Sequence, residues 1–330
     1  MTINIITVTY GKRFNLLEKT LDAIISDKNV DKIILVDNGS VNSTEIDVYI
    51  KNNRQKKIIL VRNKENIGSA GGYKAGILEA KKHVSDYVLL LDDDNVAEDN
   101  WSDYFLNILS FFPKRDDIIL VGNRTNSNFN LASIPTEKEK RFKISYFNFG
   151  KVKNFFLGQK ENSHFQPIIY MPHGAYGYGG ALLPFKAIRE TEPPFEPFYL
   201  YADDTEYLYR ISKNGYKAYQ LSRPVIRDID QTFSDLSSYL MAFDKNVSLI
   251  KLFFMTRNQY ALALMTESQT KLSIILNGVF GTSIKIAYAF IKLGINKFTI
   301  ERSKILILAF YDGVRLNFSN EKNIKKYTRL

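Results

Sequence analysis

The feature that most constrains the fold is a set of four short apolar segments within the first 91 residues. Each is rich in Ile, Leu and Val and ends in polar residues; the segments are residues 3–8, 32–36, 57–61 and 87–91. Stretches with helical spacing lie between them, at residues 16–24 and 73–82. Continuous apolar strands that alternate with helices are typical of a parallel α/β sheet covered on both faces. Ligands bind at the carboxyl ends of such strands, so the functional site is expected among the polar residues that follow them.

The second half of the chain has a different pattern. Between residues 124 and 165 no period is clear, and order returns at residues 168–170. Beyond Leu236 the chain is helical in character: Ile284, Ala287, Tyr288 and Ile291 share one face, and residues 305–310 predict a second helix that packs there. We therefore expect a catalytic domain at residues 1–235 and a helical region at residues 236–330.

Positive charge is concentrated in that helical region. The chain has a net charge of +10, and residues 236–330 hold 14 basic and five acidic side chains. A basic region behind a nearly neutral domain suggests contact with an anionic membrane surface, although ordinary solvated helices would give the same count. No nucleic-acid recognition motif is present, so nucleic acid is not an expected partner. Residues 273–291 are the most apolar long stretch, but Asn277, Gly278, Gly281 and Lys285 interrupt it as a membrane span.

The chain has no cysteine, which excludes disulfides and thiolate metal sites but identifies no compartment. Its first residues, MTINIITVTYGKRF, become polar at once and lack the long apolar core of a signal peptide. We expect a cytoplasmic protein that rests on the inner face of a membrane.

Three adjacent carboxylates, Asp92, Asp93 and Asp94, follow the fourth apolar segment. They repel one another unless a cation neutralises them. Hard oxygen ligands at a strand end suit Mg²⁺ or Mn²⁺ that holds a diphosphate. The first and third side chains of an extended segment point to the same side, so Asp92 and Asp94 are candidates to share a metal or to divide between metal and ribose. A solvated acidic turn is the alternative, and the preceding buried strand favours the metal.

Two other strand ends carry weaker signals. Asp37 and Asn38 open a tight turn whose carboxylate and amide can pair with a pyrimidine edge, but taken alone the sequence is more typical of a plain Asx turn. Residues 66–72, which include Asn66 and Gly68, precede a predicted helix. Their glycines would let backbone N–H groups approach a sugar or phosphate, although the spacing is not that of a dinucleotide-binding loop.

A second acidic pair, Asp203 and Asp204, precedes a predicted helix that ends at Asn214-Gly215. These carboxylates are helix-capping groups on one interpretation and include a general base on the other; the sequence leaves the two open. Arg210 is placed to pair with Glu206 at i,i+4. His173 and the pair Arg257-Asn258 complete the candidates, each with a plain structural alternative.

Taken in order, these segments resemble the inverting glycosyltransferases of family 2, which have the GT-A fold. The matching pieces are the opening strand through Thr9-Tyr10, residues 36–40, Asn66-x-Gly68, residues 91–94, residues 179–182 and Asp203-Asp204 with Arg210. They cover about residues 1–230, and their order is specific although no single piece is. The resemblance implies a mostly parallel central sheet followed by the helical region.

The resemblance also implies the roles of individual residues. It places the nucleotide-sugar donor against Thr9, Asp37, Asn38, Asn66, Gly68, Asp92 and Asp93. Asp92 and Asp94 would form the Asp-x-Asp metal and ribose site for Mn²⁺ or Mg²⁺, which offsets the charge of the departing nucleoside diphosphate. Asp204, beside Asp203, would take the acceptor proton while the hydroxyl attacks the anomeric carbon from the opposite face.

Two finer features are similar to galactofuranosyl- and rhamnosyltransferases. One is the glycine-rich run from Gly68 to Tyr73, and the other is Arg257-Asn258 in an aromatic helix, where Phe253 and Phe254 replace the tyrosines of that pattern. One feature departs from the group: no His follows at the usual distance after the base, and Arg227 and Asp228 stand there instead. Asp228 as the ligand, a water molecule in the site and a more weakly held metal are the alternatives.

The first choice of donor is UDP-galactofuranose, followed by dTDP-rhamnose or a UDP-pyranose. The expected acceptor is a growing, lipid-linked surface glycan, and an oligomer is compatible with the sequence. A nucleotidyltransferase would need a richer phosphate loop than Gly11-Lys12-Arg13. A catalytically degenerate binding subunit is the alternative of another class: the missing His favours it, and the intact acidic residues argue against it.

Overall fold

The computed structural model describes residues 1–53, 57–125, 168–171, 177–230, 241–266 and 269–319 of the 330-residue chain. The chain divides into two units, of which the first comprises Met1–Glu137, Phe165–Tyr199 and Asp203–Thr232, and the second Lys138–His164, Leu200–Ala202 and Phe233–Leu330. A domain boundary after residue 235 stays a prediction. Most of the predicted irregular segment at residues 124–165, and His173, lie outside the described residues.

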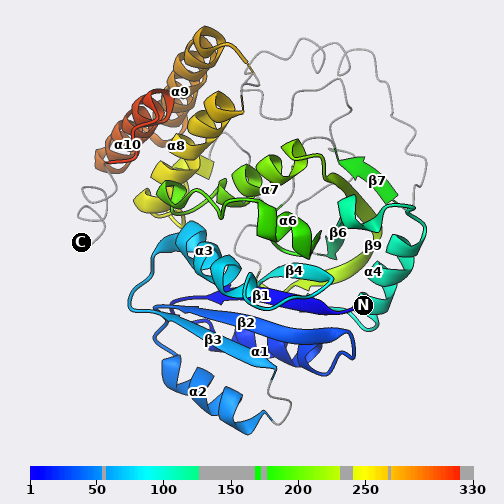
Figure 1. The fold of residues 1–330 in the computed structure, drawn as a ribbon. Coiled ribbons are helices and arrows are strands. Elements are labelled where there is room, and N and C mark those ends of the chain that lie inside the picture. Colours follow the sequence, from blue (N-terminus) through cyan, green and yellow to red (C-terminus); the bar gives the residue numbers. More distant parts are fainter. Residues whose placement is uncertain (54–56, 126–167, 172–176, 231–240, 267–268, 320–330) are drawn as a thin grey trace. The chain divides into compact units, whose positions relative to one another are not determined.

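The first unit is built on one sheet (Figure 1). Among the described residues its strand order is β3-β2-β1-β4-β8-β6-β9-β5, with β7 paired to β9. The strands are β1 (Ile3–Thr9), β2 (Val30–Asn38), β3 (Ile58–Asn63), β4 (Tyr87–Asp92), β5 (Asn95–Ala97), β6 (Ile118–Thr125), β7 (Ile168–Met171), β8 (Ala181–Pro184) and β9 (Lys217–Asp228).

The sheet is parallel from β3 to β4, and the four predicted apolar segments form these four strands. Every residue of β1 is buried, which agrees with a strand that is covered on both faces. Beyond β4 the sheet is mixed. β8 runs antiparallel to both β4 and β6, while β9 is parallel to β6. The resemblance implied a mostly parallel sheet; the antiparallel pairs come from the later strands, which lack the regular strand–helix alternation of the first 92 residues.

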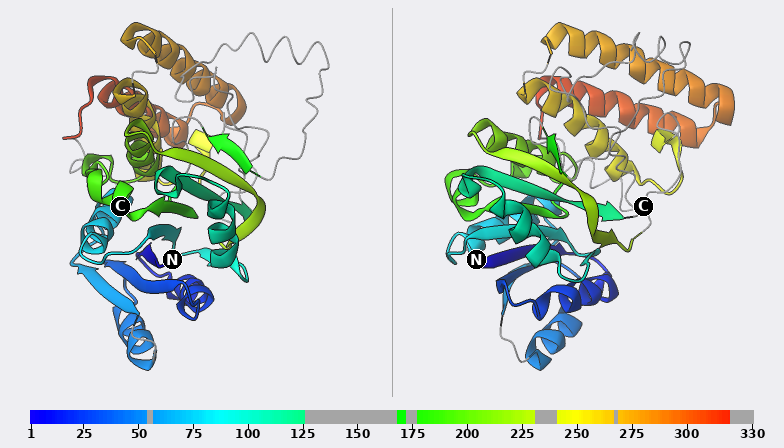
Figure 2. Two further views of the ribbon diagram at one scale, coloured as in Figure 1. Left: turned by 45° about the vertical axis from the view of Figure 1, so that its right-hand side comes forward. Right: turned by 90° about the vertical axis from the view of Figure 1, so that its right-hand side faces the viewer.

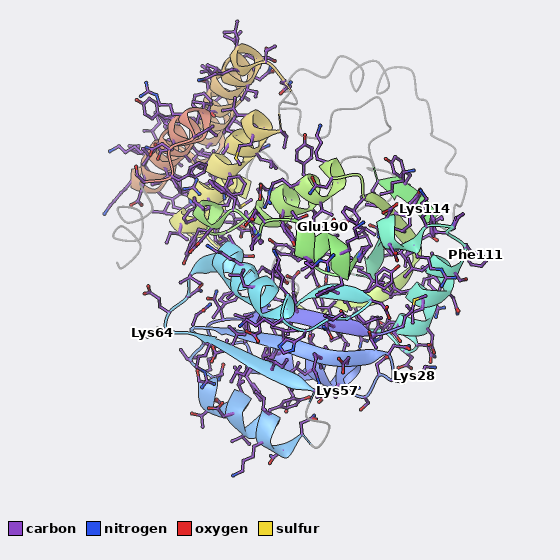
Figure 3. All side chains as sticks on the ribbon, in the orientation of Figure 1. Lys28, Lys57, Lys64, Phe111, Lys114 and Glu190 are labelled. Carbon is purple, nitrogen blue, oxygen red and sulfur yellow. The ribbon has the colours of Figure 1, made fainter. Side chains whose placement is uncertain are left out.

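Helices cover both faces of this sheet. Among its described residues the α-helices of the unit are α1 (Phe14–Ile25), α2 (Ser43–Asn52), α3 (Gly68–Ala80), α4 (Trp101–Ser110), α6 (Phe185–Glu190) and α7 (Asp203–Lys213). One buried cluster joins Ile6 and Val8 of β1 to α3, α6 and α7, and the other joins Ile3 and Ile5 to α1 and α4. Figure 3 shows side chains between the sheet and the helices, whereas the labelled Phe111 points outward and is 79% exposed.

Helix α3 begins at Gly68, five residues before the start that we predict at Tyr73. Its glycines allow the close packing that makes the segment helical. A Cβ at Gly72 would lie 2.6 Å from Val8 Cγ1, and one at Gly76 would lie 2.6 Å from Ile6 Cγ2. The burial of α3 against β1 therefore offsets the low helix propensity of glycine.

The second unit contains three helices among its described residues, α8 (Leu249–Met265), α9 (Lys271–Leu293) and α10 (Lys297–Arg315). They lie side by side (Figure 2). Glycines again permit close contact: a Cβ at Gly313 would lie 2.5 Å from the carbonyl oxygen of Arg257, and one at Gly278 would lie 2.3 Å from Phe310 Cε2. The helical character predicted beyond Leu236 is thus present, but Ala287, Tyr288 and Ile291, on the face predicted to pack, are exposed. The buried side of α9 consists of other, mostly small residues.

Candidate active site

The polar residues that follow the parallel strands meet at one edge of the sheet. In the strand registers Thr9 pairs with Asp37, Val8 pairs with Asp92, and Asn38 pairs with Asn63. This arrangement follows from strands of equal direction whose apolar segments end at the same level. The structure thereby brings together the strand-end residues that the sequence singles out.

Asp37 is fully buried at the end of β2 and is held by several donors. Its carboxylate accepts hydrogen bonds from the Ser40 backbone N–H at 2.9 Å, from Ser43 Oγ at 2.8 Å and from Arg62 Nε at 3.1 Å. Burial alone would raise the pKa of Asp37, but these hydrogen bonds outweigh it and lower the pKa below its ordinary value. The local turn is therefore formed, and a contact between Asp37 and a pyrimidine base stays a prediction.

Asn38 connects β2 to the loop before α3. Its Nδ2 donates to Asn66 Oδ1 at 3.2 Å and to the Gly68 carbonyl at 2.9 Å, and its Oδ1 accepts from the Ile67 N–H at 3.2 Å. Gly68 has a φ of +80°, and a Cβ there would lie 2.2 Å from the Tyr199 carbonyl oxygen. These contacts give Asn38, Asn66 and Gly68 a part in shaping the loop; their proposed contacts to a donor remain predictions.

An arginine lies among the acidic residues that follow β4. Arg13, at the start of α1, donates through Nε to both carboxylate oxygens of Asp93 at 3.0 Å. Its other nitrogens lie 2.8 Å from Asp94 Oδ2 and 2.7 Å from Asp230 Oδ2. Thr9 Oγ1 donates to Asp93 Oδ2 at 2.8 Å. Burial raises the pKa of Asp93 to about 6, despite the opposing effects of Arg13 and Thr9.

Asp92 lies between a tyrosine and a second arginine. Tyr73 Oη donates to Asp92 Oδ1 at 3.0 Å, and Arg124 Nη1 of β6 is 3.9 Å from Asp92 Oδ2. The same Arg124 nitrogen is 3.8 Å from Asp228 Oδ1. Gly179 leaves room for this arrangement, because a Cβ there would lie 2.9 Å from both Arg124 Nη1 and Asp92 Oδ2.

Asn95 connects Asp92, Asp94 and Asp228, the residues predicted as metal ligands. Its Oδ1 accepts from the Asp92 backbone N–H at 3.3 Å, and its Nδ2 donates to Asp94 Oδ1 at 3.3 Å and to Asp228 Oδ1 at 2.6 Å. Burial raises the pKa of both Asp94 and Asp228. The neighbouring Arg227 instead pairs with Glu98 at 3.8 Å. Within the described residues, no three acidic or histidine side chains already surround one metal position.

The second acidic pair lies at the start of α7. Asp203 is buried and accepts a hydrogen bond from Ser69 Oγ of α3 at 2.9 Å. Asp204 Oδ1 accepts from the Thr205 N–H at 2.6 Å. Burial raises the pKa of both carboxyls, and the charge of Asp204 raises that of Asp203 further. The predicted Arg210–Glu206 ion pair is confirmed.

The two acidic groups of the first unit influence one another. Burial raises the pKa of Asp92 to about 6, and the negative charge of Asp204 adds to this rise, while Arg124 opposes it. Burial also raises the pKa of Asp204, against the positive charge of the same Arg124. A Cβ at Gly177 would lie 3.1 Å from Asp204 Oδ2, so the backbone passes close to this carboxylate. The end of β4 and the start of α7 thus belong to one electrostatic site.

A strained turn precedes this acidic pair in the chain. Tyr199, Tyr201 and Ala202 all have φ between +60° and +67°, a region that non-glycine residues rarely occupy. Within the second unit, Asn258 Nδ2 donates to the carbonyls of Leu200 and Tyr201, both at 2.8 Å. Arg257, fully buried against the Phe253 and Phe254 rings, donates to Asn258 Oδ1. The Arg257-Asn258 pair therefore has a structural role.

Arg13 and Arg124 are the site residues that sequence reasoning missed. Arg13 follows β1 in the turn Gly11-Lys12-Arg13, which is too short to suggest a phosphate loop. Its position one turn after a strand end was the only available signal. Arg124 lies in a segment without clear periodicity, and only the pairing of β6 with β9 brings it to Asp228.

Solved structures with the same fold include glycosyltransferases. Residues 1–349 of TarS from S. aureus match at a TM-score of 0.53 and 10% identity, over 96% of this chain and 82% of that one. The same TarS fragment with UDP-GlcNAc matches at 0.50 and 13%, over 95% and 82%. GalNAc-T7 with UDP, GalNAc and Mn²⁺ matches at 0.54 and 14%, over 97% of this chain and 58% of that one. At these identities the likeness shows the fold, which is that of GT-A glycosyltransferases.

At the level of sequence, no curated protein matches the chain. The family model for glycosyl transferase family 2 matches residues 4–169, a range that holds β1 to β4 and the acidic residues that follow them. That range is 166 of 330 residues, just over half of the chain. The protein therefore belongs to glycosyl transferase family 2 and is a glycosyltransferase.

Proposed function

We propose that this enzyme transfers a sugar, with inversion at the anomeric carbon, from a UDP-sugar to a hydroxyl of a growing, lipid-linked glycan. The observation that carries the proposal is that Asp204 at the start of α7 and Asp92 at the end of β4 lie against the same short backbone stretch: a Cβ at Gly177 would lie 3.1 Å from Asp204 Oδ2, and one at Gly179 would lie 2.9 Å from Asp92 Oδ2. Donor-binding carboxylates and a candidate base thus occur in one site at the carboxyl edge of the sheet.

Asp204 is the proposed general base. The acceptor hydroxyl gives its proton to the Asp204 carboxylate as its oxygen forms the new bond to the anomeric carbon. The bond from that carbon to the diphosphate oxygen breaks on the opposite face, and the electron pair leaves with the nucleoside diphosphate. A buried carboxylate with a raised pKa is better matched to this proton transfer than an ordinary surface carboxylate.

Asp92, Asp94 and Asp228 are the proposed ligands for Mn²⁺ or Mg²⁺. Their donor chemistry fits a hard divalent cation, because Asn95 holds the carboxylates of Asp94 and Asp228 and the backbone of Asp92, and burial disfavours the negative charges of all three. When bound, the cation would offset negative charge on the leaving diphosphate. Arg13 and Arg124 already hold positive charge beside these carboxylates.

The choice of UDP follows from the kinds of donor bound in proteins of this fold. TarS was solved with UDP-GlcNAc and GalNAc-T7 with UDP. Galactofuranose stays the first choice of sugar because of the run from Gly68 to Tyr73 and the Arg257-Asn258 pair, with rhamnose from dTDP-rhamnose second. Asp37 and Asn38 are the proposed contacts to the base.

Calorimetric titration tests the proposal. UDP and dTDP are titrated into the full chain with and without Mn²⁺, and then into Asp94→Ala. We expect UDP to bind more tightly with Mn²⁺ and Asp94→Ala to lose that gain. An Asp103→Ala control removes a surface carboxylate that pairs with Lys28 and should bind like the wild type. Tighter binding of dTDP would shift the proposal to rhamnose, and absence of binding to either nucleotide would refute the assigned donor site.

A further inference from the structure

Helix α9 has its apolar side outward. Only five of its residues are buried, and most of them are small: Ile274, Gly278, Gly281, Thr282 and Ala289. The exposed fractions of Leu272, Leu276, Val279 and Ile291 are 66%, 61%, 50% and 80%. At about 100° per residue these four side chains fall within one sector roughly 120° wide. A water-facing helix of a soluble domain has the opposite pattern, with polar residues on its exposed side.

Helix α10, which packs beside α9, also exposes apolar side chains. Ile307 is 55% exposed and Tyr311 is 46% exposed. Lys304 and Arg315 are exposed one turn away on the same face. The exposed residues of α9 and α10 are called here the α9–α10 face. On α9 these residues are mainly apolar, and on α10 they are apolar and basic.

Length and hydropathy alone would allow α9 to cross a membrane. The helix has 23 residues and a window of mean hydropathy 1.6 that is 28% buried. The interruptions noted in its sequence therefore do not exclude a span. Its packing argues for a different role: Gly278 lies against Phe310 and Tyr260 of the neighbouring helices, and Ile274 belongs to their shared core. A helix fixed in this way offers one face to a bilayer surface.

Charge indicates which partner covers this face. The charged residues on the exposed side of α10 are Lys297, Lys304 and Arg315, against Glu301 alone. In a symmetric pair of chains the same patch meets itself, so these basic residues would be brought together. An anionic lipid surface instead attracts them while it accepts the apolar side chains.

We propose that the α9–α10 face docks on an anionic lipid bilayer, with α9 lying in the plane of the membrane interface. Its exposed apolar side chains enter the boundary between headgroups and acyl chains, and the exposed lysines of α10 contact lipid phosphates. The docking deepens the proposed function by placing the enzyme where a lipid-linked acceptor resides, and its link to that acceptor rests on the proposed function.

Vesicle co-sedimentation of the full chain tests the docking without reference to catalysis. We expect binding to vesicles of phosphatidylcholine and phosphatidylglycerol, and weaker binding to phosphatidylcholine alone. Leu276→Asp with Ile291→Asp should weaken the partition at least about tenfold, because two apolar groups no longer enter the interface. Lys297→Gln with Lys304→Gln, two exposed lysines of α10, should weaken it by about fivefold per residue on anionic vesicles only.

Val84→Asp is the matched control, since Val84 is 80% exposed but lies in the first unit. It should bind vesicles like the wild type. Absence of wild-type binding would overturn the proposal, as would unchanged binding of the Leu276→Asp, Ile291→Asp variant. A wild-type dimer that this variant dissociates, without vesicle binding by either protein, would overturn it in favour of self-association.

The lack of cysteine permits a second readout that does not depend on loss of binding. A polarity-sensitive dye on Ile291→Cys should shift to the blue when anionic vesicles are added, whereas the same dye on Val84→Cys should not. Equal shifts at both positions, or none at Ile291→Cys, would contradict insertion of α9. Because UDP titration of the same samples reports the donor site separately, failure of docking and failure of the proposed transferase site are distinguishable.

Discussion

Replacement of Arg13 by methionine should be among the most damaging single changes in the first unit. Arg13 binds Asp93, whose side chain is 4% exposed, and its own side chain is 17% exposed. Removing one partner of a buried ion pair costs about 3–5 kcal/mol, because the other charge is left without compensation. The contacts to Asp94 and Asp230, whose side chains are 20% and 26% exposed, add about 1 kcal/mol or less each. We expect Arg13→Met to lower the free energy of unfolding by about 4 kcal/mol at pH 7.

The cost should depend on pH in a defined direction. The pKa of Asp93 is already raised to about 6 with Arg13 present, and loss of Arg13 raises it further. A carboxyl whose pKa is raised by folding contributes stability below its unfolded pKa of about 3.9 and loses that contribution as pH rises through the folded value. Near pH 5 the variant's Asp93 is protonated, so the difference in stability between variant and wild type should shrink.

Urea unfolding followed by Trp101 fluorescence measures this change. Trp101 is the only tryptophan and is buried in the first unit. A loss of 4 kcal/mol lowers the midpoint by roughly 1–2 M urea. Arg62→Met is the matched control: Arg62 is 42% exposed, and its partner Asp37 keeps the hydrogen bonds from Ser40 and Ser43. Two results would refute the reasoning. One is an Arg13→Met variant that is no less stable than Arg62→Met. The other is a loss of unfolding free energy in Arg13→Met that is the same at pH 5 and pH 7.

Three further predictions follow from the site and its surroundings. Gly68→Ala should lower the free energy of unfolding in urea by at least about 3 kcal/mol, because it adds a clash with the Tyr199 carbonyl to the strain of a positive φ. The control Gly215→Ala has the strain without the clash and should cost about 1–2 kcal/mol. Equal costs would disprove the clash. Asn258→Ala should lower stability by about 2–4 kcal/mol in thermal unfolding, since two carbonyls and the buried Arg257 lose a hydrogen-bond partner. The control Asn277→Ala should cost about 1 kcal/mol. Similar losses in the two variants would contradict the structural role of Asn258. The rate of UDP release should rise with pH through an acidic limb above the ordinary carboxylate range, because Asp204 must be ionised and burial raises its pKa. Arg124→Met should move that limb to higher pH, because it removes a positive charge that lowers the pKa of Asp204; an unmoved limb would count against Asp204 as the titrating base.

The parallel half of the sheet was predictable because its signal is local. The segment at residues 87–91, for example, is continuously apolar, ends in acids, and forms β4 as expected. The start of α3 was less predictable. Gly68, Gly71 and Gly72 disfavour a helix in isolation, and the fit of Gly72 and Gly76 against β1 and β2 explains why the segment is helical. Local propensity therefore failed where long-range packing decided the structure.

The acidic half of the candidate site was also visible in the sequence, since Asp92 and Asp204 follow recognisable segments. Its basic half was not. Arg13 and Asp230 are 217 positions apart, and Arg124 meets Asp228 only through the pairing of distant strands. Neither contact leaves a periodic pattern. The outward apolar face of α9 was predicted to pack inside the helical region, because periodicity identifies a face but not its partner.

The most direct test of the central claim is UDP release from a panel of UDP-sugars by the wild type and by Asp204→Asn, with Mn²⁺ present. Water or a sugar hydroxyl is the acceptor in this assay, and either needs a base. We predict measurable release by the wild type, a decrease of about 10²–10⁴-fold in Asp204→Asn, and no change in the surface control Asp103→Asn. Turnover by Asp204→Asn equal to that of the wild type would contradict the assignment of Asp204 as the catalytic base.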